Sequence, residues 1–532
     1  MSHPNPPRRW ARRALIASTL VVGLVGLSAC ATDPGGAASD DRELDLLIPA
    51  FPASWDARAT SGFYLTAQLL INEPMVALAP DGSFVPTLAE SVDQPDLSTY
   101  VYTLREGVTF TDGSPLTVED VLYTFDLHSA EGTTSFMARY MAGIESVEAT
   151  ADHEITVKLA APDPEWPYTI ARMGIVSAAY YDEHPESVGT PDVPQLGTGP
   201  YTVESISAGS KLDLERNDDY WGAKPEYDAI NFEAPADDNA RLLALQSGEY
   251  DAILQAPLSQ LSSLTSIPGY NLTEVPEVAT YRISMDVTKA PFDDPAVRRA
   301  IAHAVDREAM LEAALSGHGT VSNGIVPAEL LIGLGEAQPV EDAYESFGDS
   351  LTYDVDAAAE ELAASSVPDG FAVEVLVQQS DPAQTLMAQI LAQSLAEIGI
   401  DVSVSQVDDN TFLSRLYLDK TGDGLVVFSF NAGSAEPANM ARSAFTAGDF
   451  GNMEQFTTPA ITEALQAYKS EEDDAARQAL LLQIFADANA EVPYVPVFHP
   501  SVAAVVADDL EVKDFTSFWW ASRIDEIIVP TA

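Results

Sequence analysis

The residues with catalytic or metal-binding side chains form no complete motif in this sequence. The chain has seven histidines, and His153-Glu154 lacks the second histidine that a zinc-binding His-Glu-x-x-His helix requires. Residues 419–424 match the start of a calcium-binding loop, but Thr421 stands at its third position and Phe430 replaces its bidentate glutamate. We interpret that segment as a turn. Because a nucleophile elbow and a phosphate-binding loop are also missing, the sequence predicts no catalytic residue, no metal site and no cofactor.

The single cysteine, Cys30, has the context of a lipid attachment site. Four arginines within 8–13 precede an apolar run, 14–27, which is too short for a comfortable membrane span. Small residues then lead to Cys30, and this arrangement resembles the lipobox of a bacterial lipoprotein signal peptide. The resemblance implies cleavage before Cys30 and lipidation of its thiol, with residues 30–42 as a flexible tether. An ordinary secretory signal with an incidental cysteine is the alternative, and the export route is open.

Composition narrows the class of protein further. The 532 residues include 26 Lys+Arg and 82 Asp+Glu, for a formal net charge of −56, and 46% are apolar. The apolar share is enough for two to four folded domains. So acidic a chain lacks the basic stripe that nucleic acid requires and the basic patch that holds peripheral proteins on anionic lipid. One cysteine also excludes an intramolecular disulfide framework, a cysteine-ligated zinc site and an iron–sulfur cluster.

Strands and helices alternate in the second half of the chain. An alternating, β-branched segment predicts a strand over 371–377, and Asp381-Pro382 supplies the N-cap and first residue of a helix. Apolar residues at helical spacing follow, and Gly399 suits the position after the helix. The pattern continues with a strand over 400–404, a short helix over 411–418 and a strand over 425–430. A βαβαβ order is typical of a largely parallel sheet covered by helices.

Further elements are predicted nearer the N-terminus. A helix begins at Asp294-Pro295, with Arg298-Arg299 on its polar face, and another spans 239–247 before Gly248. Residues 78–195 instead contain short alternating strands and many turn signals, which predict a smaller α+β unit.

Seven segments of the chain, in order, resemble the extracellular solute-binding proteins of family 5, the oligopeptide-, dipeptide- and nickel-type receptors of ABC importers. The resemblance runs from about residue 43 to about residue 525. The segments are 86–91, 100–121, 197–201 (Gly-Thr-Gly-Pro-Tyr), 214–221, 244–251, 294–307 and 395–402.

This resemblance implies an α/β fold of two lobes, similar to periplasmic binding proteins, in which two crossing strands join the lobes and a ligand binds between them. Closure of the lobes is then a hinge motion. An extra α+β subdomain is inserted in lobe I. The implied boundaries are 1–29 for the signal peptide, 43–77, 196–290 and 508–532 for lobe I, 78–195 for the insertion and 291–507 for lobe II.

A cleft receptor needs aromatic platforms and a few polar anchors, so we expect ligand contacts in loops that face the gap. Residues 428–437 are one such segment, because they leave a parallel strand at its carboxyl end. Among Phe518, Trp519 and Trp520 we expect one to face the cleft. The candidate contacts are Phe51, Trp55, Tyr281, Arg282, Asn323, Phe430, Asn431, Glu436, Trp519 and Trp520.

One departure from the resemblance bears on the ligand. Peptide-binding members have an aspartate shortly after this strand that pairs with the peptide's α-amino group. With Glu436-Pro437 as the alignment anchor, that position is Gly433, so the carboxylate is missing or has moved to Glu436. This leaves room for a sugar or another neutral solute.

We therefore predict a receptor and no enzyme. It captures an oligopeptide, or alternatively an oligosaccharide, and delivers it to the permease subunits of an ABC importer. The predicted location is the outer face of the bacterial cell membrane, through the N-terminal lipid only, with no nucleic-acid partner. A secreted glycoside hydrolase with two carboxylates is a remote alternative, but pairs of acids prove nothing among 82 of them.

Overall fold

The structure, a computed structural model, describes residues 42–531 except for 53, 60–61, 80–81, 419 and 421–423. The predicted signal peptide, Cys30, most of the tether and most of the turn at 419–424 lie outside the described residues. None of the helices described in this range is long and apolar enough to cross a membrane.

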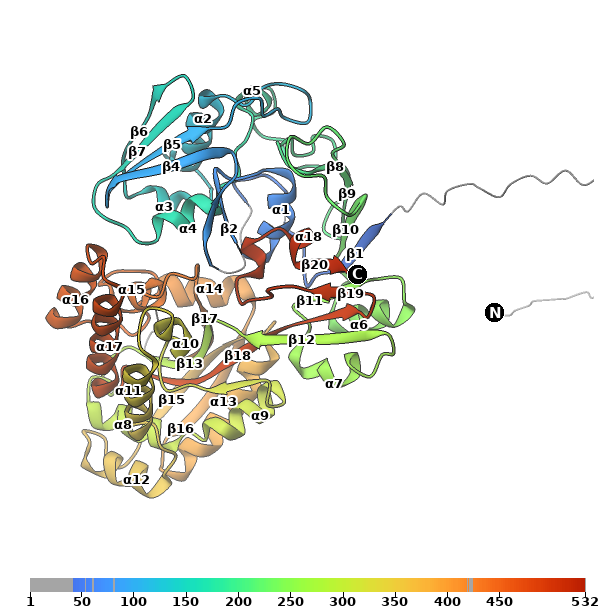
Figure 1. The fold of residues 1–532 in the computed structure, drawn as a ribbon. Coiled ribbons are helices and arrows are strands. Elements are labelled where there is room, and N and C mark those ends of the chain that lie inside the picture. Colours follow the sequence, from blue (N-terminus) through green and yellow to red (C-terminus); the bar gives the residue numbers. More distant parts are fainter. Residues whose placement is uncertain are drawn as a thin grey trace, which may run out of the picture. The chain divides into compact units, whose positions relative to one another are not determined.

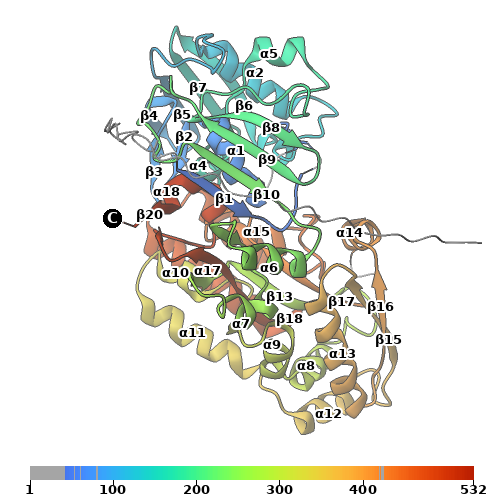
Figure 2. The ribbon, with the colours of Figure 1, turned by 90° about the vertical axis from the view of Figure 1, so that its right-hand side faces the viewer.

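A twelve-stranded sheet runs through the described part of the chain (Figure 1). Its strand order is β16-β15-β17-β13-β18-β11-β1-β10-β9-β8, and β12 and β14 pair with β18. Strands β1, β10, β9 and β8 lie side by side at one end (Figure 2). The bounds are β1 Glu43–Leu47, β8 Tyr201–Ser207, β9 Lys211–Arg216, β10 Ala229–Glu233, β11 Ala252–Leu254, β12 Tyr270–Pro276, β13 Ala279–Met285, β14 Gly319–Val321, β15 Ala372–Gln378, β16 Asp401–Val407, β17 Leu425–Asn431 and β18 Tyr494–Ala507.

Two long antiparallel segments connect the two ends of this sheet. Strand β18 pairs with β12 over Tyr270–Pro276 and then with β13, where the register shifts between Tyr281 and Arg282. Strand β13 also pairs with β17, so the second half of the β12–β13 segment lies at the end of the sheet formed by β17, β15 and β16. The short break between β12 and β13, residues 277–278, therefore lies where the chain passes from one end of the sheet to the other.

The predicted βαβαβ unit is confirmed. Strand β15 pairs in parallel with β16 and with β17, and helices α13 (Pro382–Glu397) and α14 (Asp409–Leu418) connect the strands. The Asp381 carboxylate accepts the backbone N–H of Ala383 at 3.0 Å and of Gln384 at 3.3 Å, as its N-cap position predicts. These sequence signals are reliable because the N-cap and the glycine that ends a helix act through the few residues next to them.

Helices cover this end of the sheet, and two apolar cores lie against it. Arg298 differs from expectation: its guanidinium is buried and donates to the carbonyls of Glu491 and Phe292, so only Arg299 remains on the outer face. The helices are α8 Pro295–Ala304, α9 Arg307–Leu315, α10 Ala328–Ile332, α11 Ala337–Asp349, α12 Val355–Ala364, α15 Asn439–Phe445, α16 Pro459–Lys469 and α17 Asp474–Glu491.

The other end of the sheet has its own core, and the segment between β3 and β8 has another. That segment carries a separate four-stranded sheet in the order β4-β5-β7-β6. The division into lobe I, insertion and lobe II stays a prediction. The remaining elements are α1 Leu65–Ile71, β2 Val76–Leu78, β3 Phe84–Pro86, β4 Ala89–Asp96, β5 Thr99–Leu104, α2 Val118–Ser129, α3 Ala138–Met141, β6 Ile144–Ala151, β7 Glu154–Leu159, α4 Trp166–Ala171, α5 Ala178–Glu183, α6 Asp238–Ser247, α7 Leu261–Leu264, β19 Leu510–Val512, α18 Ile524–Ile527 and β20 Ile528–Pro530.

Candidate functional site

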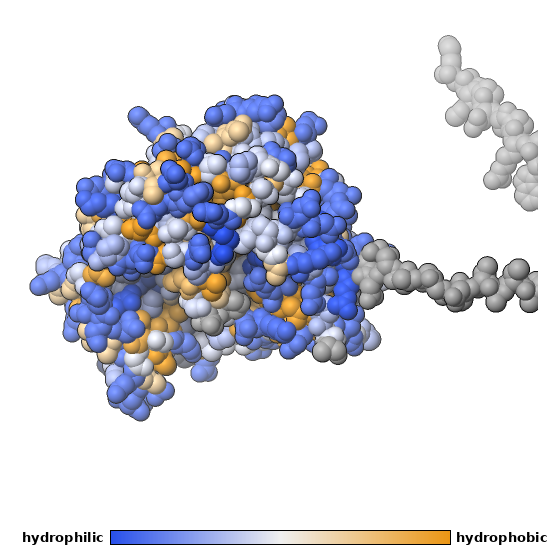
Figure 3. Space-filling model, turned by 45° about the horizontal axis from the view of Figure 1, so that its top comes forward, coloured by the Kyte–Doolittle hydropathy of each residue, from blue (hydrophilic) through white to orange (hydrophobic). Residues whose placement is uncertain are grey.

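Three neighbouring cavities surround Asn431, the last residue of β17. The first has a volume of about 620 Å³, the second about 460 Å³ and the third about 290 Å³. Asn431 lines all three, and Gln255 and Glu277 line both the second and the third. We call the three together the cleft. It lies at the carboxyl end of a parallel strand, where ligands bind in open α/β sheets. The face of the protein in Figure 3 is mostly hydrophilic, with scattered hydrophobic patches.

A buried hydrogen bond fixes the loop that brings Phe136, Arg139 and Tyr140 to the first cavity. His128, at the end of α2, is bonded through Nδ1 to Ser135 Oγ at 2.6 Å, and Ser135 Oγ accepts the backbone N–H of Met137. Burial lowers the pKa of His128 to about 4, so its ring is neutral at ordinary pH. The loop therefore enters α3 in a defined position.

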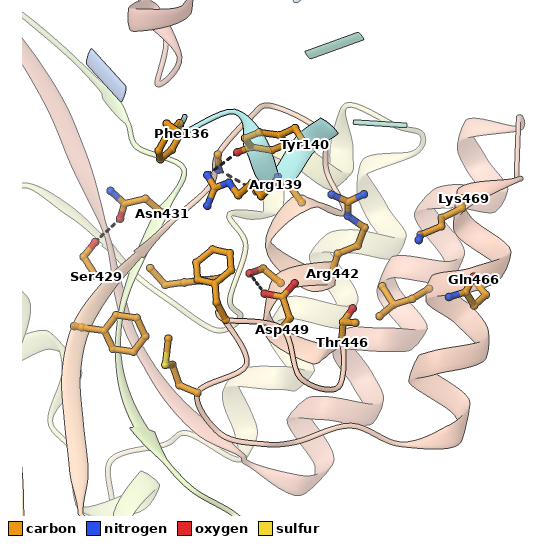
Figure 4. Close-up of a pocket in the computed structure, with 18 residues that line it drawn as sticks. Phe136, Arg139, Tyr140, Ser429, Asn431, Arg442, Thr446, Asp449, Gln466 and Lys469 are labelled. Carbon is orange, nitrogen blue, oxygen red and sulfur yellow. Dashed lines mark hydrogen bonds between the residues drawn. The ribbon is translucent and has the colours of Figure 1, made fainter. Parts of the chain in front are cut away.

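The first cavity has a basic wall. Arg139, Arg442 and Lys469 line it, and Asp449 is the one carboxylate among its lining residues. Figure 4 shows Arg442 and Lys469 on the side opposite Asn431 and Ser429. The Asp449 carboxylate already accepts bonds from Ser443 and from the backbone of Gly451. The wall is therefore positively charged, although the protein as a whole is strongly acidic.

Two of these three cations lack a carboxylate partner within 4.0 Å in the described part of the chain. The Arg139 guanidinium lies 4.5 Å from the Phe136 ring and 4.6 Å from the Tyr140 ring, and it donates to Tyr140 Oη at 2.7 Å. Lys469, the last residue of α16, has neither an ion pair nor a hydrogen bond there. Both are available to an anionic group, whereas Arg442 is already paired.

Arg442 belongs to a cluster that joins the two sides of the cleft. Its Nη1 donates to Asp163 at 2.8 Å, and its Nη2 lies 3.6 Å from Glu165. Glu165 also accepts from Asn439 at 2.9 Å, and Arg172 pairs with Glu165 at 3.3 Å and donates to the carbonyl of Gly433. The residues that flank α4 are thereby tied to α15 and to the loop after β17.

The third cavity also has aromatic walls. Tyr140, Phe518 and Trp520 line it, together with Gly433. A Cβ at Gly433 would approach Tyr140 Oη to 3.0 Å, so a side chain there needs the tyrosine to move. No carboxylate enters the cleft from this position. In the described residues no group of three or more His, Cys, Asp or Glu side chains is placed to hold a metal ion.

Four of the ten candidate contacts line the cleft. Tyr281 lies in the second cavity, where its hydroxyl donates to Asp381 at 3.0 Å, and Phe430 lies in the first. Asn431 lines all three cavities, and Trp520 lines the third. Phe518 lines the third cavity as well, so two members of the aromatic group reach the cleft where one was expected.

Two charged candidates lie outside the cleft and have partners in the protein. Arg282 is fully buried, 3.4 Å from Glu454, and its guanidinium lies behind the rings of Phe428 and Phe430. Glu436 is 2% exposed and accepts from Tyr468 at 2.6 Å and from Arg477 at 2.9 Å. Burial raises the pKa of Glu436 to about 7, although both partners oppose the rise. We correct both to structural residues.

The other four candidates also lie outside the cleft. Trp55 and Trp519 are buried in the core formed around β1, and Phe51 packs edge-to-face on Trp55. Asn323 is bonded to Arg307 and to the carbonyl of Tyr344. The three aromatic side chains therefore serve core packing, and the asparagine side chain fixes its loop.

Sequence analysis missed Phe136, Arg139, Glu277 and Lys469. A signal for Arg139 was present, because Phe136 precedes it by three residues and Tyr140 follows it directly. Glu277 had no such signal among 82 acidic residues.

Comparison with protein families gives one match over most of the chain. The model described as "Bacterial extracellular solute-binding proteins, family 5 Middle" matches residues 83–452. The glutathione-binding protein GsiB of Salmonella paratyphi A is 27% identical over 315 residues, which are 58% of this chain and 58% of that protein. GsiB of Escherichia coli K12 is 28% identical over 327 residues, or 60% of each. The matched segment thus spans less than two thirds of these relatives.

Solved structures of binding proteins have the same fold over nearly their whole length. AgaA from A. tumefaciens R10, in complex with agropinic acid, superposes with a TM-score of 0.76 at 22% identity, covering 92% of this chain and 99% of that one. AppA from Bacillus subtilis, in complex with a nonapeptide, gives 0.74 at 18%, covering 92% and 100%. DppA from Helicobacter pylori, in complex with the peptide STSA, gives 0.75 at 21%, covering 92% and 98%.

Proposed function

Because the chain belongs to the bacterial extracellular solute-binding proteins of family 5, we propose that it is the solute receptor of an ABC importer. It captures a peptide-like solute that carries a carboxylate and delivers it to the permease subunits in the membrane. Its relatives named for glutathione binding support a small peptide as the ligand.

The basic wall of the first cavity carries this proposal. In a protein with a net charge of −56, unpaired cations would be expected to find carboxylates, yet Arg139 and Lys469 have none within ion-pairing distance in the described residues. A ligand carboxylate between them forms charge-assisted hydrogen bonds, which are stronger than neutral ones. The acidic surface elsewhere repels anions, so the wall concentrates the attraction at one place.

Aromatic and amide groups supply the rest of the recognition. Tyr140, Phe430 and Trp520 offer ring faces, and Asn431 offers a donor and an acceptor to all three cavities. The Asn431 side chain accepts from Ser429 at 2.6 Å, which orients its amide. Peptide groups match this combination of ring faces and amide hydrogen bonds.

We propose that the predicted lobes move about the two long segments between them. The β12–β13 segment and β18 are the connections within the large sheet, and the break at 277–278 is where backbone torsions change most easily. The cluster of Arg442, Asp163 and Glu165 then joins the lobes when they are closed.

Titration calorimetry with tripeptides and oligosaccharides tests the receptor function, with mass spectrometry of the recovered ligand. Saturable binding of a tripeptide, recovered intact, is the expected result. Arg139→Ala weakens it, whereas Arg415→Ala does not, since Arg415 pairs with Glu374 outside the cleft. Binding of oligosaccharides alone contradicts the peptide ligand, and turnover of any ligand contradicts the receptor.

We also propose that the receptor is held on the outside of the cell membrane by lipid at Cys30, as the sequence before that cysteine predicts. In fractionated cells, Cys30→Ser moves the protein from the membrane to the soluble extracytoplasmic fraction. Retention of the variant on the membrane contradicts the lipid anchor.

A further inference from the structure

Glu277 is a carboxylate in the middle of the cleft that has no partner among the described residues. It lies in the break between β12 and β13 and lines both the second and the third cavity. Its backbone N–H donates to the carbonyl of Pro500 at 2.9 Å, so its main chain is fixed to β18. Its side chain has no ion pair and no hydrogen bond to any described residue.

The other carboxylates of the cleft are occupied. Asp381 accepts from the Tyr281 hydroxyl and caps α13, and Asp238 pairs with Arg241 at 2.5 Å. Asp449 accepts from Ser443 and from Gly451. Among the described lining residues Glu277 is thus the carboxylate whose hydrogen-bonding capacity is left for a ligand.

No cation among the residues that the structure describes neutralises Glu277. Arg139 and Arg172 line the third cavity with it, but Arg139 lies against aromatic rings and Arg172 is committed to Glu165 and Gly433. Glu277 is half-buried, and a carboxylate that loses part of its water without gaining a counter-ion is costly; this desolvation raises the pKa of Glu277 to about 7. A cation that enters the cleft removes that cost.

We propose that Glu277 binds a cationic group of the ligand, an ammonium or a guanidinium. This inference rests on the proposed function and deepens it: the receptor selects a solute with a cation at the junction of the second and third cavities and an anion at the basic wall of the first. Asn431, which lines all three cavities, lies between the two charged ends. The ligand is therefore a solute with separated opposite charges, held with its cation toward the crossing strands.

Three tripeptide libraries test this assignment by affinity selection and mass spectrometry. The first has free amino groups and no Lys, Arg or His, the second is the same library N-acetylated, and the third is N-acetylated with one Lys or Arg in each member. The wild-type protein is expected to retain the first or the third library and not the second. Glu277→Gln lowers that retention about 30-fold or more, because a shielded charge pair loses one partner.

Glu274→Gln is the matched control, since Glu274 lies on β12 and pairs with His318 outside the cleft. The Glu274→Gln variant is expected to retain the tripeptide libraries as the wild type does. Equal retention of the N-acetylated library, or retention by Glu277→Gln equal to wild type, overturns the role of Glu277 and leaves the receptor function standing. If the wild type retains no member of any library, both the inference and the peptide-like ligand are overturned.

Discussion

Glu454 in the core is buried and Glu277 in the cleft is half-buried, and the two carboxylates differ in their partners. Glu454 is 1% exposed, lies 3.4 Å from Arg282 and accepts a bond from Ser284. Glu277 has no such partner among the described residues. Burial raises the pKa of both, and at Glu454 the Arg282 guanidinium and Ser284 oppose the rise.

The core supplies its own counter-ion to a buried acid, and the described residues of the cleft do not. A buried acid with its own counter-ion contributes to a stable arrangement of side chains, here behind the Phe428 and Phe430 wall of the first cavity. An acid without a counter-ion can instead form an ion pair with a cationic ligand. The same substitution, glutamate to glutamine, is therefore expected to have opposite effects at the two positions.

The largest effect is expected at the core. Glu454→Gln leaves the Arg282 guanidinium buried without a counter-ion, and breaking such a pair costs about 3–5 kcal/mol of the free energy of unfolding. Urea unfolding followed by circular dichroism measures the loss. Replacing both partners, with Arg282→Met and Glu454→Gln, is expected to recover much of it, since no charge then remains buried. A single variant as stable as wild type contradicts a structural ion pair.

The basic wall comes next. We expect the double variant Arg139→Ala, Lys469→Ala to bind the best tripeptide ligand of the wild type with about 10- to 100-fold lower affinity. The reason is that two charge-assisted contacts to the peptide carboxylate are lost. The C-terminal amide of that peptide should show the same loss with wild type and no further loss with the variant. Calorimetry measures all four affinities. Additive losses would contradict a contact between wall and carboxylate.

Some of this arrangement can be predicted from the sequence and some cannot. Asp381-Pro382 and Gly399 mark a helix through interactions within a few residues, so the βαβαβ unit was found with nearly correct bounds. Tyr281 and Arg282 were both named, yet one lines the cleft and the other is buried. Neighbours on a strand point to opposite faces, and only the pairing of β13 with β17 and β18 decides which face meets the cavity.

Glu277 and the basic wall show the other limit of the sequence. Arg139 and Lys469 are 330 residues apart in the chain, and no local pattern brings α3 and α16 to one cavity. For Glu277 the informative property is the lack of a partner, which depends on every element around it.

In the cleft, the substitution Glu277→Gln is expected to raise stability, whereas Glu454→Gln in the core lowers it. The native pKa of Glu277 is raised from an ordinary 4.5 to about 7, so the native state holds its proton more tightly than the unfolded chain does. The free energy of unfolding therefore falls as pH rises between about 4.5 and 7. Glu277→Gln removes that fall and should stabilise the unliganded protein by about 1–2 kcal/mol at pH 8, with little difference at pH 4.5. Urea unfolding at both pH values measures this, and a destabilised variant at pH 8 would indicate a structural role.

Per pH unit, the smallest effect is a pH dependence of binding. Below about pH 7 the free protein carries a proton on Glu277 that a cationic ligand must displace, so affinity is expected to fall about tenfold per pH unit as pH decreases, and to level off above 7. The charged and titratable groups that line the same two cavities are Asp238, Asp381, Tyr281, Tyr140, Arg139 and Arg172. A probe whose cation is a Lys or Arg side chain keeps its own charge across pH 5–8. Calorimetry of wild type and Glu277→Gln with that probe separates the contribution of Glu277, because the glutamine variant loses the slope while those six groups remain. An identical slope in both proteins would place the titrating group elsewhere in the cleft and remove the distinction between Glu277 and Glu454.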